Sequence, residues 1–154
     1  MTPVRYVECP QEFGEGEENR SIFLAGGITG CPDWQADVRR MLGGSNWTLL
    51  NPRRAAPAAW SEETSAAQIE WEFRHLRMAD AVLFWFPAES VCPIALFELG
   101  AWTMTDKPIF VGADPAYPRR RDIVLQTALA RPEIVIHSNL EELIESVENY
   151  RNNR

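Results

Sequence analysis

Ala81-Val-Leu-Phe-Trp-Phe86 is an unbroken run of apolar residues, and it decides the fold class. A run without alternation is typical of a parallel strand that is covered on both faces, whereas a strand with one exposed face alternates apolar and polar residues. Other short apolar runs, each followed by a helix-compatible stretch, are Ile22-Phe-Leu-Ala25, Trp47-Thr-Leu-Leu50, Ile109-Phe-Val111 and Ile134-Val-Ile-His137. The pattern predicts a doubly wound α/β fold around a five-stranded, mostly parallel sheet.

The ends of the chain add less regular features. Residues 4–9 can form a further edge strand, and the Gly- and Glu-rich residues 11–20 predict a mobile loop. From Asn139, a potential cap, the spacing of apolar residues predicts a closing amphipathic helix. Its apolar positions are Leu140, Leu143, Ile144 and Val147.

The composition narrows the classes of function. The chain has 154 residues, 45% of them hydrophobic, so we expect one core and a single domain over residues 1–154. A net charge of −7 disfavours a nucleic-acid polymer bound through bulk electrostatics. No stretch approaches the roughly 18 apolar residues of a membrane span, and the N-terminus lacks the order of a secretory signal. We therefore expect a cytoplasmic protein without a membrane partner.

Cysteine and histidine are too sparse for the common metal sites. Cys9, Cys31 and Cys92 form neither a C-x-x-C pair nor a Cys/His cluster, so we expect reduced thiols. The other candidate ligands, His75 and His137, are the only histidines. The sequence therefore favours neither a histidine-based catalytic triad nor a metal site.

Glu98 is a carboxylate in the middle of Cys92–Met104, a segment that otherwise predicts a buried helix with Pro93 at its first position. An ionised carboxylate in apolar surroundings is costly or has a shifted pKa. Such a group has chemistry to do, or it is tied to a buried arginine or to backbone donors as a structural anchor. Both interpretations are open from the residues alone.

A second unusual carboxylate, Glu72, lies in a helix predicted from about Ser65 to Ala79. Ser65-x-x-Gln68 resembles a capping box, and the apolar stripe of the helix consists of Ile69, Phe73 and Leu76. At 100° per residue, Glu72 falls inside this stripe. We therefore expect its carboxyl group to face the sheet or a pocket.

Trp71 points nearly opposite to that stripe. An indole on the outer side of a helix suggests a subunit interface or a contact with another segment of the chain. Trp71 is therefore a candidate interface residue.

Ligands of open parallel sheets bind beyond the carboxyl ends of the strands, where the strand order reverses. Three loops follow predicted strands at that edge, namely residues 25–30, 51–54 and 87–92. We expect them to converge on one pocket.

The candidate binding residues come from these loops and their surroundings. Gly26 and Gly27 would allow close approach of a ligand, and Arg53 could bind a phosphate or carboxylate. Trp34, Trp85, Phe86 and Pro87 could stack on a nucleobase, and Asn51 and Cys92 complete the set. The alternatives are a tight turn without a ligand for the glycines, a solvated side chain for Arg53, and core or rim packing for the aromatic residues.

Several of these segments, in this order and spacing, resemble the nucleoside 2-deoxyribosyltransferases and their relatives, including the deoxynucleoside monophosphate N-glycosidases. The segments are Ser21-Ile-Phe-Leu-Ala-Gly26, Glu72, Ala79-Asp80 and Phe97-Glu-Leu-Gly100. Asn51-Pro-Arg53 and Trp71-Glu72 are similar to the bacterial and phage branch called nucleoside 2-deoxyribosyltransferase-like. The resemblance implies a flavodoxin-like form of the doubly wound fold.

The resemblance also implies a reaction. Glu98 would be the nucleophile that attacks the anomeric carbon of a 2-deoxyribosyl group, and Glu72 would protonate or hydrogen-bond the leaving base. Water as acceptor gives hydrolysis, and a second base gives transfer. This chemistry needs no cofactor. The resemblance implies a small-molecule nucleoside or nucleotide as partner, and a homo-oligomer in which a neighbouring chain completes the pocket. Asp80, at a helix–strand junction, is expected to be structural.

Two residues depart from the family pattern. Many relatives have a tyrosine whose hydroxyl group contacts the nucleophile, where this chain has Phe23, and an acidic residue that holds the sugar, where this chain has Cys92. The alternative function is therefore a non-catalytic nucleotide or nucleotide-sugar binding module that has kept the pocket. A flavodoxin-type electron carrier is a further alternative, but the chain lacks its Ser/Thr-rich phosphate loop.

Overall fold

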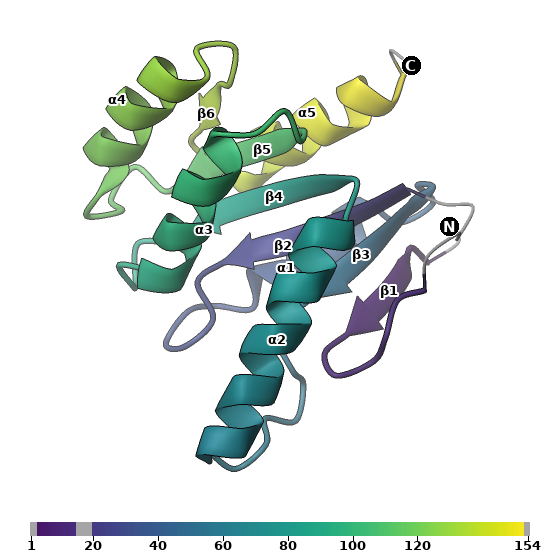
Figure 1. Cartoon of the computed structure of the whole chain (residues 1–154). Coiled ribbons are helices and arrows are strands. Elements are labelled where there is room, and N and C mark those ends of the chain that lie inside the picture. Colours follow the sequence, from purple (N-terminus) through teal and green to yellow (C-terminus); the bar gives the residue numbers. More distant parts are fainter. Residues whose placement is uncertain (1–2, 15–19, 153–154) are drawn as a thin grey trace.

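The structure is a computed structural model that describes residues 3–14 and 20–152. Within them, a parallel sheet has the strand order β1-β3-β2-β4-β5-β6, flanked by helices (Figure 1). The strands are β1 (Arg5–Glu8), β2 (Arg20–Gly26), β3 (Trp47–Asn51), β4 (Ala81–Phe86), β5 (Ile109–Ala113) and β6 (Ile136–His137). The helices are α1 (Trp34–Met41), α2 (Glu62–Met78), α3 (Pro93–Thr103), α4 (Arg120–Ala130) and α5 (Leu140–Asn152).

The predicted fold class is confirmed. All of the predicted strands form, although β6 is shorter than the predicted residues 134–137, and the edge strand within residues 4–9 is β1. Without β1, the strand order is that of flavodoxin-like proteins. Every residue of β4 is buried, as expected of a central strand covered on both faces.

Two hydrophobic layers cover the sheet. One layer joins α1 and α5 to one face through side chains such as Val38 and Leu143. The other joins α2, α3 and α4 to the opposite face through side chains such as Leu76, Leu99 and Ile123. Figure 1 shows α2 and α3 on the same side of the sheet. No helix among the described residues is long and apolar enough to cross a membrane.

The direction in which successive strands are added to the sheet reverses at β2. This strand pairs with β3 on one side and with β4 on the other, so β2 and β4 flank the switch point. The loops that follow both strands lie at their carboxyl ends, where ligands of this fold class bind. The fold therefore places residues 26–30 and 87–92 at the same edge of the sheet.

Helix α2 begins earlier than predicted. Ser61, not Ser65, is its cap: the Ser61 hydroxyl accepts from the Thr64 backbone N–H at 3.0 Å, and the Thr64 hydroxyl accepts from the Ser61 backbone N–H at 2.9 Å. This reciprocal pair is a capping box in which threonine takes the place of the usual Glu or Gln. The predicted box at Ser65 is therefore wrong.

The inward face of α2 also differs from the predicted stripe. Ile69 and Phe73 are 62% and 60% exposed, whereas Trp71, His75 and Leu76 are buried. Hence the predicted stripe is wrong at two of its three positions. At 100° per residue, Glu72 lies between His75 and Leu76, and it still points inward.

Trp71 is a core residue. It is 2% exposed within the single chain, its ring stacks on His75 at 3.9 Å, and its indole N–H donates to the Gln11 carbonyl at 2.8 Å. The suggestion that Trp71 lies at a subunit interface is therefore wrong, because the indole is buried against its own helix, β2 and the segment after β1.

The predictions for the ends and junctions of the chain can also be compared with the structure. Residues 15–19 of the predicted mobile loop lie outside the described residues, and Phe13, within the same predicted loop, is buried. The Asn139 side chain accepts from the Glu142 N–H at 2.8 Å and caps α5 as predicted. Asp80 has the expected structural role, since its carboxylate accepts from the Ser21 N–H at 2.7 Å and thereby joins β2 to the end of α2.

Candidate active site

A cavity of about 330 Å³ opens at the switch point of the sheet. Its walls come from β2 and the following loop, from Pro52, from α2 and from the start of α3. The lining side chains include Phe23, Ile28, Thr29, Ser90, Ile94 and Ala95. Glu72 from α2 and Glu98 from α3 also line this cavity, so the structure brings together the two carboxylates that were singled out in the sequence.

Glu98 is a largely buried carboxyl group in the wall of the cavity. Its Oε2 atom is buried and has no hydrogen-bond partner among the described residues. Burial, together with the nearby charge of Glu72, raises the pKa of Glu98 to about 8. The structural-anchor interpretation predicts an arginine or backbone donors at this carboxyl group, and no described residue forms a salt bridge with it.

Glu72 faces the cavity from the inward side of α2. Burial raises the pKa of its carboxyl group, and a hydrogen bond from Gln68 opposes this effect. The bond joins Gln68 Nε2 to Glu72 Oε1 at 3.0 Å, across one helical turn. Two carboxyl groups with raised pKa values in one cavity are typical of a catalytic site.

Gly26 and Gly27 both line the cavity, and the structure gives each of them a packing role. A Cβ atom on Gly26 would lie 2.1 Å from the Trp85 carbonyl oxygen. On Gly27 it would lie 2.6 Å from Cys31 Sγ and 2.9 Å from Cys92 Sγ. Larger residues are therefore excluded here by the close approach of neighbouring protein atoms, whether or not a ligand binds.

Cys92 lines the cavity at the start of α3. Its backbone is in the left-handed region, with φ 51° and ψ 58°, which is uncommon for a residue other than glycine. Burial is the main cause that raises the pKa of its thiol to about 11. Cys92 is thus a neutral, weakly polar group at the position where relatives have an acidic residue.

A second cavity of about 640 Å³ adjoins the first. The two cavities share Ile28, Thr29, Pro52 and Glu72 as lining residues. The second one extends along the loop before α2 and the first turns of that helix, with Arg54, Trp60 and Gln68 in its walls. Glu72 therefore stands at the junction between the two spaces.

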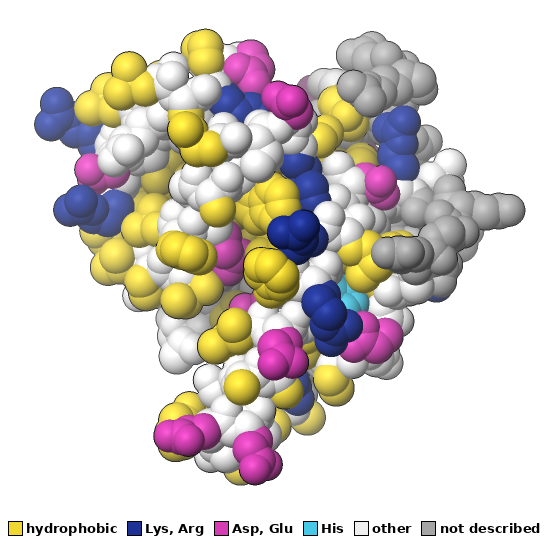
Figure 2. All heavy atoms as spheres, viewed as in Figure 1, with side chains coloured by type: hydrophobic (Ala, Val, Ile, Leu, Met, Phe, Trp, Pro, Cys, Tyr) yellow, Lys and Arg dark blue, Asp and Glu magenta, His cyan; other side chains and the backbone are white. Residues whose placement is uncertain are grey.

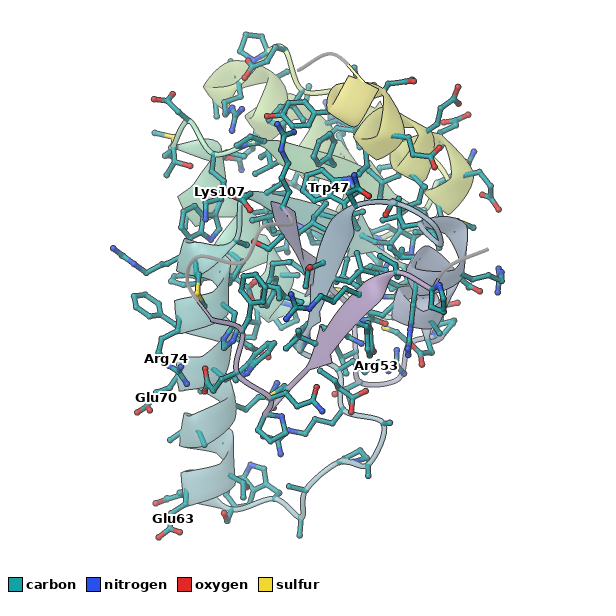
Figure 3. The ribbon with its side chains drawn as sticks, turned by 90° about the vertical axis from the view of Figure 1, so that its right-hand side faces the viewer. Trp47, Arg53, Glu63, Glu70, Arg74 and Lys107 are labelled. Carbon is teal, nitrogen blue, oxygen red and sulfur yellow. The ribbon has the colours of Figure 1, made fainter. Side chains whose placement is uncertain are left out.

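Arg53 lines the second cavity, but most of its donors are already used. Its guanidinium group donates to the carbonyl oxygens of Cys31 at 2.9 Å and Pro32 at 2.8 Å, and to the Gln35 side chain at 3.2 Å. Arg53 therefore fixes the loop after β2 (Figure 3). Arg54 donates through Nε to Gln68 at 2.9 Å, and its guanidinium group also lies beside the Cys9 thiol.

Five of the predicted binding residues do not line either cavity. Four of them are buried in the two hydrophobic layers or beneath the loops, namely Trp34, Trp85, Phe86 and Pro87. The fifth, Asn51, is 2% exposed; its side chain donates to the Tyr6 hydroxyl and accepts from the Arg53 N–H. The stacking predictions are therefore wrong, because these rings are covered by α1, α5 and the loop after β5 instead of facing the crevice.

The sequence reasoning did not assign a role in the site to Gln68. Its signal was available, because Gln68 precedes Glu72 by four residues and such residues are neighbours on a helix surface. The apolar lining residues Ala25, Ile94 and Ala95 had no distinguishing signal, since they match the core pattern of their elements.

The family described as "Nucleoside 2-deoxyribosyltransferase like" matches residues 19–117. A solved structure titled "Crystal structure of conserved protein from Enterococcus faecalis V583" aligns with 86% of this chain and 99% of that chain, at a TM-score of 0.56 and 14% sequence identity. This similarity concerns the fold alone. No curated protein matches the chain in sequence.

The family match covers more than half of the chain and contains both cavity carboxylates together with the two strands that flank the switch point. The chain therefore belongs to the nucleoside 2-deoxyribosyltransferase-like family.

Proposed function

We propose that the protein cleaves or transfers the N-glycosidic bond of a 2-deoxyribonucleoside or deoxynucleotide through a covalent glycosyl-Glu98 intermediate. The observation that carries the proposal is that Glu72 and Glu98, from two helices, line one cavity and form no salt bridge with any described residue. Membership of the family supports nucleoside glycosyl transfer or hydrolysis in general.

In the proposed reaction, a carboxylate oxygen of Glu98 attacks C1′ of the deoxyribosyl group. The C1′–N bond breaks, its electron pair remains on the base nitrogen, and the base accepts a proton from Glu72. Water or a second base then attacks C1′, the Glu98–C1′ bond breaks, and the proton of the acceptor returns to the carboxyl pair. Two carboxyl groups thus divide the roles of nucleophile and acid, as in retaining glycosidases.

The electrostatics of the cavity support a pair of carboxyl groups that shares one proton. Near neutral pH the pair retains a proton, since the pKa of Glu98 is about 8 and that of Glu72 is also raised. The leaving base needs one proton, and the pair can supply it without a cofactor. A carboxylate that is poorly solvated is also a stronger nucleophile, because fewer solvent interactions must be removed before it attacks.

The two cavities suggest how a nucleoside would lie. A sugar in the smaller cavity would have C1′ near Glu98, and a base in the larger one would place its glycosidic nitrogen near Glu72. Both volumes fall within or close to the range of small-molecule sites, about 300–1,000 Å³. Glu72, which lines both spaces, is then next to the bond that breaks.

The non-catalytic binding module is the second candidate, and two observations favour it. Phe23 lines the cavity and cannot donate a hydrogen bond to Glu98, and Cys92 cannot hold a sugar hydroxyl as a carboxylate would. This candidate predicts that a nucleotide or nucleotide sugar binds and is not cleaved.

A homo-oligomer remains part of the proposal, and we place its contact on the exposed apolar side chains of α2 and α3, of which Ile69 and Ile94 also line the cavities. Ile69, Phe73, Ile94 and Phe97 are all at least 60% exposed there. Figure 2 shows hydrophobic side chains gathered over these two helices. Exposed apolar groups of this size often mark contacts between protein chains. A second chain on this face would lie beside the cavity that both helices border.

The test is release of free base from a panel of deoxynucleosides and deoxynucleoside 5′-monophosphates, followed by chromatography, with and without a second base as acceptor. Glu98→Gln and Glu98→Ala should abolish release, and Glu72→Gln should slow it by at least tenfold. The matched control is Glu70→Gln, on the same helix, because Glu70 is exposed and points away from the molecule (Figure 3). Intact mass spectrometry of the stopped reaction should detect one deoxyribosyl group on the wild type and none on Glu98→Gln.

Release of base by the wild type and by Glu70→Gln, but not by the Glu98 variants, would support the proposal. If the wild type binds a ligand of the panel and releases nothing, the binding module replaces the enzyme. If base is released equally by wild type and by Glu98→Ala, Glu98 is not the nucleophile and the mechanism is wrong.

A further inference from the structure

The Gln68 side chain is fixed by hydrogen bonds at both ends of its amide. Its Oε1 atom accepts from Arg54 Nε at 2.9 Å and from Cys9 Sγ at 3.1 Å. Its Nε2 atom donates to the Pro52 carbonyl at 2.8 Å and to Glu72 Oε1 at 3.0 Å. Gln68 thus connects the start of the loop before α2, the turn after β1 and the carboxyl group at the junction of the cavities.

This arrangement permits only one orientation of the amide. A flipped amide would place its carbonyl oxygen against two acceptors, the Pro52 carbonyl and Glu72. It would also place its NH₂ group against the N–H of Arg54, which can only donate. The Gln68 NH₂ group must therefore face Glu72, and the positive charge of Arg54 at the other end strengthens it as a donor.

Glu98 has no comparable support. Its Oε2 atom is buried without a hydrogen-bond partner among the described residues, and its cavity neighbours Phe23, Ala25 and Ala95 are apolar. A donor stabilises the ionised form of a carboxyl group, and apolar surroundings stabilise the neutral form. The surroundings of Glu72 therefore favour its ionised form, and those of Glu98 favour its protonated form.

We propose that Gln68 is a positioning residue that holds Glu72 as a hydrogen-bond acceptor, so that in the empty site the proton of the carboxyl pair rests on Glu98. The inference builds on the proposed function, because the proton must then reach Glu72 before the base can leave. The Glu98 O–H bond breaks and a Glu72 O–H bond forms, directly or through one water molecule. Glu98 is then an ionised nucleophile and Glu72 a protonated acid, and no net proton is gained or lost.

The charges around the pair agree with this assignment. Gln68 is the cause that lowers the pKa of Glu72 against burial, whereas both causes acting on Glu98 raise its pKa. Other charged or titratable groups near these walls, within the described part of the chain, are Arg54 and Cys9 beside Gln68, Glu12 beyond Cys9, Arg53 in the second cavity, Cys92 beside the glycines, and Cys31 and Glu89 near Cys92. Cys92 is neutral near pH 7, since the pKa of its thiol is about 11.

The experiment measures the protonation of the two carboxyl groups without any nucleoside. The protein is labelled with ¹³C at the glutamate carboxyl carbons, and NMR titrations of the wild type, Gln68→Met and Gln68→Glu are compared, with Glu72→Gln and Glu98→Gln for assignment. Methionine has the length of glutamine and no amide donor. Gln126→Met, at an exposed position of α4, is the matched control.

In the wild type, Glu98 should titrate at higher pH than Glu72. Gln68→Met should raise the proton affinity of Glu72 about tenfold, which is the effect of one lost hydrogen bond to a charged group. The difference between the pKa values of Glu98 and Glu72 should then become smaller or change sign. Gln68→Glu keeps the acceptor for Arg54 and Cys9 but replaces the donor to Glu72 by a second carboxylate, so it should raise the proton affinity of Glu72 by more than Gln68→Met does, and it serves if the methionine variant does not fold. Gln126→Met should leave both titrations unchanged.

The inference is overturned if Glu72 titrates above Glu98 in the wild type, or if neither Gln68 variant shifts either carboxyl group. These outcomes are separate from failure of the proposed function. A protein that shows the predicted shifts but releases no base from any nucleoside retains the Gln68 role and loses the reaction. If base is released but the Gln68 variants do not shift the titration of either carboxyl group, the proposed reaction stands and the proposed role of Gln68 is wrong.

Discussion

Replacement of Glu98 by glutamine should stabilise the folded protein at alkaline pH. The pKa of Glu98 is raised from its ordinary value of 4.5 to about 8 in the folded protein, mainly by burial. The folded state therefore holds a proton that the unfolded chain releases above pH 4.5, and stability falls as the pH rises from there through about 8. Glutamine has nearly the same shape and never ionises, so the variant avoids this loss.

The difference between 4.5 and about 8 corresponds to about 4 kcal/mol of unfolding free energy at pH 8. For a chain of this length, that change raises the melting temperature by about 10 °C. At pH 4.5 wild type and Glu98→Gln should melt at nearly the same temperature, because Glu98 is then neutral in the folded state and only half ionised in the unfolded chain.

Thermal unfolding followed by circular dichroism between pH 4.5 and pH 8.5 measures this effect. Glu145→Gln, at an exposed position of α5, is the control and should follow the wild type at every pH. The reasoning is refuted if Glu98→Gln is no more stable than the wild type at pH 8. A gain of equal size at pH 4.5 and pH 8 would also refute it, because that gain would come from packing and not from the charge.

Three further predictions concern other parts of the structure. Trp71→Ala should lower the free energy of unfolding in urea by about 3–5 kcal/mol, because a fully buried indole is removed; an effect below 1 kcal/mol would mean that Trp71 is not a core residue. Burial lowers the pKa of His75, whose Nε2 accepts from the Phe13 N–H, so the stability of the wild type relative to His75→Gln should decrease as the pH falls from 7 to 5; an advantage that does not change with pH would contradict this. Light scattering should give a mass above the 17.5 kDa of one chain, and Phe97→Glu should reduce it to that value; an unchanged assembly would exclude this face.

The sheet could be predicted from the sequence because its strands are short apolar runs with no competing interpretation. Residues 81–86 have no polar position, and the structure buries all of them. The pocket location followed from the same prediction, since the loops after β2 and β4 must lie at the switch point. Glu98 was identifiable because a carboxylate interrupts an apolar helix.

The rotation of α2 could not be predicted, because the helix is apolar on more than one side. Ile69 and Phe73 are four residues apart, as are Trp71 and His75, and helical periodicity alone does not decide which of these two pairs is buried. The second face is buried because the indole N–H and the imidazole ring find partners in the segment after β1. Those partners are distant in sequence and have no local signal.

The stacking predictions failed for a related reason, which lies in the geometry of strands. Successive side chains of a strand point to opposite faces, so Trp85 and Phe86 enter different layers of the core, and neither reaches the crevice at the end of the sheet. Among the described strands, only β2 adds side chains to the cavity, namely Phe23 and Ala25 near its carboxyl end, and both are apolar. The site therefore depends on the helices and loops at the switch point, which is why its two carboxylates come from α2 and α3.

The packing of α2 and α3 on the sheet links the stability of the fold to the proposed chemistry. Glu72 and Glu98 are carried by neighbouring helices that pack on the same face of the sheet, so the packing that buries these helices also brings the two carboxyl groups into one apolar cavity. Ionising both groups there is costly, and the pair is most stable when it holds one proton. Departure of a nucleobase consumes one proton and needs one carboxylate, so the singly protonated pair is the form that the proposed reaction requires.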